Sequence, residues 1–396
     1  MKNSRLRAWW WHRQGLDGSL REKTPAEILE RCGWSRSVGG VGPYLTLFAR
    51  GGTSREAADR AVSSLEIHEL PVARGCTYVV PASDFALGLT VGRNFSGDMK
   101  TALKLGVTEK EVDRLCEAVV KALAHGALDP DGIREATGSA SRSLGAEGKK
   151  KGLTTTLPLA LGRLQTEGRI RRVPVNGRLD QQRYAYVAWT PSPLVAYPES
   201  LEAAFTELAR RFFRWVGPAT LGEFQWFAGL GVKTTKQAVE PLGLVPMEPG
   251  SDRLLAPDDA AAFRELEAPA TPQYSLVSSL DPITANRREM QSLIDDKDRE
   301  RTVMVDAASK PVGGLADLPS HAILDRGQII GLWEFDVTSG SIVCATFGRR
   351  KDKSLVAAVE ETEAFVRDQL GDARSFSLDS PKSRVARLES LRAMGR

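Results

Sequence analysis

Histidine and cysteine are scarce in this chain of 396 residues, and that scarcity excludes several kinds of site. There are four of each, spread along the chain, and no CxxC or HExxH pattern brings them to the spacing of metal ligands. We therefore expect no zinc site of the usual spacing and no secreted disulfide framework, and we expect the histidines to have structural roles.

Long apolar runs and nucleotide-binding motifs are also missing. No stretch is apolar for long enough to span a membrane. The block Trp9–Trp11 is flanked by basic residues and is too short for a signal peptide. The glycines of Gly39–Gly42 fit neither a Walker motif nor GxGxxG after a strand, and Gly148-Lys149 lacks the Ser or Thr that must follow. We expect a cytoplasmic protein that binds no nucleotide, and the glycines could instead let the backbone approach DNA phosphates.

The composition that remains is that of an ordinary globular protein, 42% apolar and 26% charged, with a formal net charge of +4. The length predicts roughly two to four domains. Because the net charge is modest, a preference for nucleic acid must come from basic residues that are clustered locally.

The most informative segment covers residues 153–189. Apolar residues recur at helical spacing from Leu157 to Leu164, and Gly168 then ends the helix. Two strand-like runs flank Asn176-Gly177, which is a strong signal for a short hairpin. A helix followed by a β-ribbon is the order of a winged helix, a module that places its helix in a groove of duplex DNA.

Charge supports that interpretation. From Lys149 to Arg183 the chain carries nine Lys or Arg against two acidic residues. A basic helix and ribbon fit the phosphates of DNA, although winged helices also dock proteins and a basic face can be merely solvated. The predicted DNA-binding residues are Lys149, Lys150, Lys151, Arg169, Arg171, Arg172, Arg178 and Arg183.

The order of helix followed by hairpin occurs three times along the chain. Capping boxes at Thr24, Thr108 and Thr220 start helices in each block, and each block closes with two strand-like runs. Beyond these blocks the pattern changes to strands and then to one more helix. We predict an α+β protein with three tandem winged-helix domains and a C-terminal β-barrel-like domain with a terminal helix, at residues 1–104, 105–195, 196–268 and 269–396.

Five segments, taken in order, carry a resemblance to a known family. They are HRQGL at His12–Leu16, LFAR at Leu47–Arg50, RGCTYVVPASD at Arg74–Asp84, SSLDPITANRR at Ser278–Arg288 and LDRGQIIGLWE at Leu324–Glu334. Together they resemble the bacterial winged-helix DNA glycosylases of the AlkZ type, which excise alkylated purines and unhook interstrand crosslinks. The resemblance implies three winged helices and a β-barrel, with no metal and no cofactor.

The resemblance also implies a catalytic motif that this chain lacks. Family members are expected to carry Gln-aliphatic-Gln or Gln-aliphatic-Asp ahead of LFAR, where the side chains stabilise the cationic sugar and orient a water. Counting back from Arg50, the motif falls near Arg36-Ser37-Val38, and residues 33–44 contain no Gln, Asp or Glu. An arginine would repel the developing cation, while Ser37 could hold a water. The chain has lost catalysis, uses another acid, or places the motif in a different register.

Few residues could replace the motif. Gln14 and Ser37 are the weak catalytic candidates, with Asp17, Glu66 and Glu69 as further carboxylates, and for each of the polar residues a structural role is the simpler interpretation. The leading hypothesis is a monomeric, nucleoid-associated protein that binds double-stranded DNA, alkylated or crosslinked, and acts as a monofunctional glycosylase. The alternatives are a non-catalytic DNA-binding protein, a transcription regulator, and a scaffold that binds only proteins.

Overall fold

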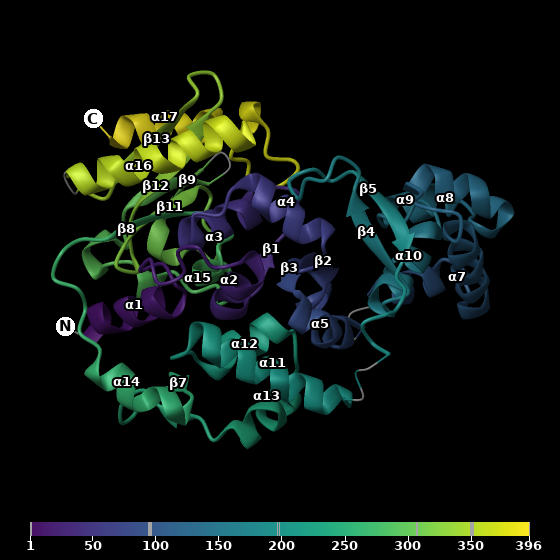
Figure 1. Cartoon of the computed structure of the whole chain (residues 1–396), viewed down its shortest axis with the longest axis horizontal. Helices are drawn as coiled ribbons and strands as arrows, with labels where there is room; N and C mark the ends of the chain where they lie inside the picture. The colour runs from purple at the N-terminus through teal and green to yellow at the C-terminus, as the bar shows by residue number, and fades with distance from the viewer. Residues whose placement is uncertain are drawn as a thin grey trace.

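The computed structural model describes residues 2–93, 97–195, 197, 199–305, 308–348 and 352–395. Within them, four groups of helices and strands follow one another along the chain. Figure 1 shows a large body and, at its right, an arm built from the second group. The prediction of a mixed fold of helices and antiparallel strands is confirmed.

The first group places helices around a small antiparallel sheet with strand order β1-β3-β2. Its second helix begins at the capping box predicted from the sequence, in which the Glu27 N–H donates to Thr24 Oγ1 (3.3 Å) and the Thr24 N–H donates to the Glu27 carboxylate (2.9 Å). Its elements are α1 (Lys2–Arg13), α2 (Pro25–Cys32), β1 (Ser35–Arg36), α3 (Gly42–Gly51), α4 (Arg55–Ser63), β2 (Ile67–Pro71), β3 (Thr77–Pro81), α5 (Phe85–Gly92) and α6 (Gly97–Lys104).

The second group, together with α6 at the end of the first, forms the arm, and its own hydrophobic core extends from Ala102 of α6 to Tyr186. Helices α7 and α10 pack together, and β4 and β5 form an antiparallel ribbon after them. The elements are α7 (Glu109–Leu123), α8 (Pro130–Thr137), α9 (Gly145–Lys150), α10 (Leu157–Thr166), β4 (Ile170–Pro174) and β5 (Tyr184–Ala188).

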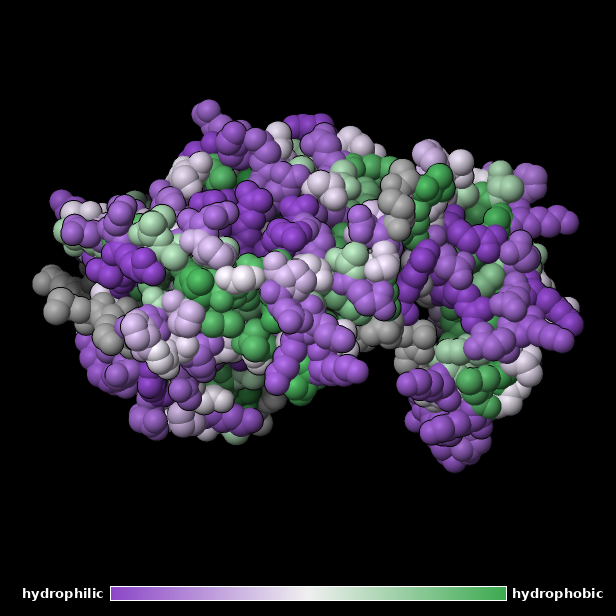
Figure 2. All heavy atoms as spheres, turned by 90° about the horizontal axis from the view of Figure 1, so that it is seen from below, coloured by the Kyte–Doolittle hydropathy of each residue, from purple (hydrophilic) through white to green (hydrophobic). Residues whose placement is uncertain are grey.

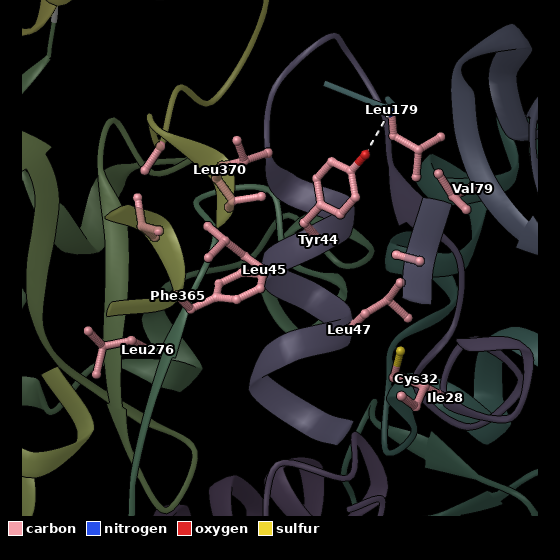
Figure 3. Close-up of a cluster of buried hydrophobic side chains, with 14 of the residues drawn as sticks. Ile28, Cys32, Tyr44, Leu45, Leu47, Val79, Leu179, Leu276, Phe365 and Leu370 are labelled. Carbon is pink, nitrogen blue, oxygen red and sulfur yellow. Dashed lines mark hydrogen bonds between the residues drawn. The ribbon is translucent and has the colours of Figure 1, made fainter. Parts of the chain in front are cut away.

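The ribbon differs from the short hairpin predicted at Asn176-Gly177. Strand β4 ends at Pro174 and β5 begins only at Tyr184, so a long loop joins them. The cause is Leu179, which is fully buried in the core of the body and whose N–H donates to the Tyr44 hydroxyl at 2.9 Å (Figure 3). Burial of this side chain outweighs the local preference of Asn-Gly for a tight turn.

The third group contains α11 (Leu201–Val216), whose buried side chains recur at helical spacing, and the predicted capping box at Thr220 starts the next helix. The predicted hairpin around Gly250-Ser251 is present as two very short paired strands. The further elements are α12 (Leu221–Ala228), α13 (Val232–Val239), β6 (Val245–Pro246), β7 (Leu254–Leu255) and α14 (Ala260–Glu265).

The last group corrects the predicted β-barrel. In the part of the chain that the structure describes, the sheet is open, with antiparallel order β13-β12-β11-β8, and β9 pairs only with β10. Two helices cover the sheet instead of further strands closing it. The elements are β8 (Tyr274–Val277), α15 (Pro282–Ala285), β9 (Thr302–Val305), β10 (Ala308–Pro311), β11 (His321–Asp325), β12 (Gln328–Asp336), β13 (Ser341–Thr346), α16 (Lys353–Phe365) and α17 (Pro381–Met394).

Shared hydrophobic clusters hold the body together. One cluster joins Leu45 of α3 to Phe365 of α16, and the rings of Phe48 and Phe365 stack with centroids 4.0 Å apart. A second joins Trp34 to the aromatic residues of α11, and a third packs Trp9–Trp11 against the C-terminal sheet. Apart from α6, the first, third and last groups therefore form one packed body, from which the arm projects.

Candidate nucleic-acid interface

A cleft of about 840 Å³ separates the arm from the body. In Figure 2 the arm stands beside the body, and a hollow with many hydrophilic residues on its walls opens between them. The body contributes the turn between β2 and β3 together with the end of α5, and the arm contributes α7 and one face of α10. Residues that line it include Pro71, Arg74, Gly75, Arg93, Glu109, Pro158, Gly162, Arg163, Gln165 and Thr166.

Helix α10 is the element that the sequence predicts as a recognition helix, and it does line the cleft. Its basic residue Arg163 is engaged within the arm, where it pairs with Glu109 and with Asp113 at 2.6 Å. Arg93 reaches across from the body and donates to the Thr166 carbonyl at 3.1 Å. Arg74 stands on the body wall of the cleft, over the ring of Trp226, and has no ion pair among the described residues.

The strand expected to hold the family's catalytic residues is β1. Its continuation, Ser37, donates through its N–H to the Thr77 carbonyl at 3.0 Å. The Ser37 hydroxyl donates to the carboxylate of Glu69 on β2, and the Tyr184 hydroxyl approaches the same carboxylate at 3.5 Å. Ser37 and Glu69 are each only 3% exposed, because the ribbon of the arm covers them.

The opposite face of the same strand carries Arg36. Side chains alternate along a strand, so Arg36 points away from Ser37 and lies 5.8 Å from the centroid of the Tyr78 ring. A guanidinium over an aromatic face is attracted by the ring quadrupole. The two faces of this sheet therefore differ in charge. One face carries Ser37 with the buried carboxylate of Glu69, and the other carries the guanidinium of Arg36.

Comparison with known proteins identifies the family. A model of the AlkZ-like DNA glycosylases matches residues 41–367. This chain belongs to that family. Among solved structures, the DNA glycosylase AlkZ of Streptomyces sahachiroi has the same fold, with a TM-score of 0.70 and 18% identity over 94% of this chain and 98% of that one. No curated protein matches.

Membership makes the protein DNA-glycosylase-like, DNA-binding and related to DNA repair, and it directs attention to the predicted DNA contacts. Several of those basic residues have carboxylate partners within the chain. Arg169 pairs with Glu117 at 3.0 Å, and Lys150 pairs with Glu147 at 2.8 Å. Arg178 binds Asp180 at 2.9 Å, and it also donates to a backbone carbonyl at the end of the π-helical turn after α16.

Two more of the predicted contacts face the body. Arg172 donates to Thr77 Oγ1 at 3.3 Å and stacks over the Tyr184 ring at 4.6 Å. Burial lowers the pKa of Arg171, which is also partly covered. Lys149, Lys151 and Arg183 are exposed and have no ion pair among the described residues. The ribbon is thus partly a joint between arm and body, which charge counting alone does not reveal.

Gln14 lies far from any open surface. It is fully buried, and its amide nitrogen donates to the carbonyls of Cys32 and Trp215 at 2.9 and 2.8 Å. Its amide oxygen accepts from Arg50 at 3.1 Å. Every polar atom of the amide is therefore used in holding helices together, and this placement argues against Gln14 as a catalytic group.

Sequence reasoning named Glu69 only as a further carboxylate and did not select Arg74, although Arg74 opens one of the family segments. The signal was the Arg-Gly pair between two strands, which places a cation at the tip of a turn. No cluster of three His, Cys, Asp or Glu side chains suitable for a metal occurs among the described residues. None of the described helices is long and apolar enough to cross a membrane.

Proposed function

We propose that this protein binds double-stranded DNA carrying alkylated or crosslinked bases and hydrolyses the N-glycosidic bond of the damaged nucleotide. The observation that carries the proposal is the contact between Ser37 and Glu69, which brings a carboxylate to the strand where the family's catalytic amides are expected. Cleavage gives the sugar cationic character, and a carboxylate stabilises a cation and accepts a proton from the attacking water. Ser37 orients that carboxylate.

Access to Glu69 requires movement of the ribbon. Glu69 is covered by Tyr184 of β5, and Arg172 of β4 stacks on that tyrosine. DNA that enters the cleft must displace Tyr184 before a sugar can reach the carboxylate. The long loop after β4 is the part of the arm that makes contact with the body here, so the proposed reaction couples binding in the cleft to opening of this joint.

For the DNA contacts we propose that α10 enters a groove of the duplex and that the exposed residues Lys149, Lys151 and Arg183 bind phosphates. The sequence of helices and a ribbon in residues 1–104, 105–195 and 196–268 supports the assignment of three winged helices, followed by a C-terminal unit at 269–396. Three such modules give a single chain an extended footprint of its own. We therefore expect a monomer that associates with the nucleoid.

The second candidate function is DNA binding without hydrolysis. It is favoured by Arg36, which stands in the segment where the family's catalytic amides are expected and would repel the sugar cation, and by the nearly complete burial of Glu69. Both candidates share binding of duplex DNA. They differ in whether a base is released.

The experiment that tests the proposal measures release of 7-alkylguanine and unhooking of an interstrand crosslink from duplex DNA. We expect release by the unchanged protein and a roughly 100-fold slower rate for Glu69→Gln, since a positioned acid or base contributes at least that factor. Glu66→Gln is the matched control, because Glu66 is exposed on the same segment and should leave the rate unchanged. Tight binding with no release at stoichiometric protein would reject hydrolysis and leave the second candidate.

A further inference from the structure

Three arginines form a row over two aromatic rings of the body, and one of them, Arg36, lies on the face of the β1-β3-β2 sheet opposite to Glu69. The guanidinium carbon of Arg74 lies 3.7 Å from the centroid of a Trp226 ring, and that of Arg288 lies 5.3 Å from it. Arg36 lies over Tyr78 at 5.8 Å. Burial raises the pKa of the Tyr78 phenol, while the charges of Arg36 and Arg74 oppose that shift, so both cations act on one ring.

The charge of this row is poorly balanced within the chain. Of the three arginines, only Arg288 forms an ion pair among the described residues, with Asp317 at 3.3 Å, and both of those side chains are about half exposed. Arg74 has no ion pair among the described residues; its guanidinium forms a side-chain hydrogen bond with Tyr78, while its Nε and Nη2 atoms are buried without a hydrogen-bond partner. Two guanidiniums near one indole repel each other, and a bound anion would offset that repulsion.

The backbone is strained at both residues that share the indole. Arg74 has φ 57° and Arg288 has φ 57°, the left-handed region that side chains other than glycine rarely occupy. Strained residues persist when the surroundings hold them, and they occur preferentially at binding sites. Stacking on Trp226 also fixes the planes of both guanidiniums in advance, which lowers the entropy lost when they bind a ligand.

The position of the row indicates the anion. Arg74 and Gly75 line the cleft between arm and body, and Arg36 is linked to Arg74 through the Tyr78 ring, on which both charges act. We propose that Arg36, Arg74 and Arg288 bind phosphodiester groups of one DNA strand, so that the strand crosses the β1 face of the body. This inference rests on the proposed binding of duplex DNA. It does not depend on hydrolysis.

The assignment gives Arg36 a role in the segment where the family's glutamine is expected. A cation on this face would hold the backbone of the DNA strand, whereas Glu69, the carboxylate that the reaction would use, lies on β2 and on the other face of the sheet. Guanidinium groups suit phosphate because they donate two parallel hydrogen bonds. The aromatic platforms then act as positioning residues for the cations and need not touch DNA.

The test is a titration of a fluorescent duplex at several salt concentrations. For Arg74→Gln and Arg36→Gln we expect binding about tenfold weaker, the effect of losing a hydrogen bond to a charged group. The slope of log affinity against log salt should become shallower by roughly one for each phosphate that the variant no longer neutralises. Arg74→Lys keeps the charge and removes the flat stacking surface, so it should retain most of the salt slope with reduced affinity.

Arg392→Gln is the matched control, since Arg392 is a half-exposed arginine on α17, away from the arm in Figure 1. A duplex with single methylphosphonate linkages gives a second measurement. One or two neutral linkages should weaken binding by the unchanged protein and have no further effect on Arg74→Gln.

Three results would overturn the inference. If Arg74→Gln lowers only the melting temperature and leaves the salt slope unchanged, the stack on Trp226 is structural. If all linkages weaken Arg74→Gln as they weaken the unchanged protein, the phosphate lies elsewhere. If the unchanged protein does not bind duplex DNA at low salt, the proposed function fails together with this inference, and the first two results leave that function standing.

Discussion

Replacement of Arg50 by methionine should be among the most damaging single changes in this protein. Arg50 and Asp281 form an ion pair in which neither side chain is exposed, with two N–O distances of 2.8 Å. Arg50 also donates to the carbonyls of Gln14 (2.7 Å) and Thr46 (3.1 Å). Burial lowers the pKa of Arg50, but the charge of Asp281 more than compensates and raises it, so the guanidinium stays charged.

The size of the loss follows from what the substitution leaves behind. Methionine fills much of the volume but leaves the Asp281 carboxylate buried and without its partner, which costs about 3–5 kcal/mol. Arg50→Met combined with Asp281→Asn removes that unpaired charge and keeps an oxygen for the cap of α15, so the double variant should be more stable than the sum of the single losses predicts.

The free energy of unfolding is read from urea titrations followed by tryptophan fluorescence. Tryptophans occur in the clusters of the body and not in the core cluster of the arm, so the signal reports on the body. Arg60→Met is the control, because Arg60 and Glu56 form an exposed pair worth at most about 1 kcal/mol. A loss for Arg50→Met within about 1 kcal/mol of the control would refute the structural role given to this pair.

Two further predictions concern the packing of the body. Burial lowers the pKa of His68 to about 3, so only the unfolded chain takes up a proton as the pH falls below about 6.5, and stability should decrease from there toward pH 3. Urea titrations across this range should show a smaller decrease for His68→Phe than for the exposed control His125→Phe, and equal decreases would contradict the assignment. Leu179→Ala should lower the free energy of unfolding by about 2–5 kcal/mol, because Leu179 is buried in the core of the body. Val175→Ala, at the exposed part of the same loop, is the control and should cost less than about 0.5 kcal/mol. Similar losses for the two variants would mean that the loop does not anchor the arm.

Much of the fold was predictable because its signals are local. The capping boxes at Thr24 and Thr220 and the strands on either side of Ala73–Gly75 depend only on neighbouring residues. The closure of a sheet depends on pairing between distant segments, and here helices α16 and α17 take the place of further strands. The loop after β4 is a similar case, since the Asn-Gly signal is real but Leu179 finds a deeper site in the body.

The candidate site was less accessible to sequence reasoning. Charge counting selected Arg169 and Arg178. The carboxylate partner of Arg169, Glu117, is brought close only by the folded chain. Arg178 pairs with its near neighbour Asp180, but its contact with the Leu370 carbonyl also depends on the fold. The contact between Ser37 and Glu69 depends on the register of β1 and β2, which lie on either side of β3 in the sheet and are far apart in the sequence. The family segments did locate one buried contact. Arg50 of LFAR pairs with Asp281 of SSLDPITANRR and donates to the Gln14 carbonyl of HRQGL, so the three segments meet there.

The most direct test of the account is amide hydrogen exchange with and without duplex DNA. If the duplex lies in the cleft between arm and body, protection should appear in the turn Ala73–Gly75 and in helix α10, on the two walls of the cleft, while α17 should exchange as in the free protein. Protection confined to surfaces outside the cleft, with both walls unchanged under saturating DNA, would contradict the central claim.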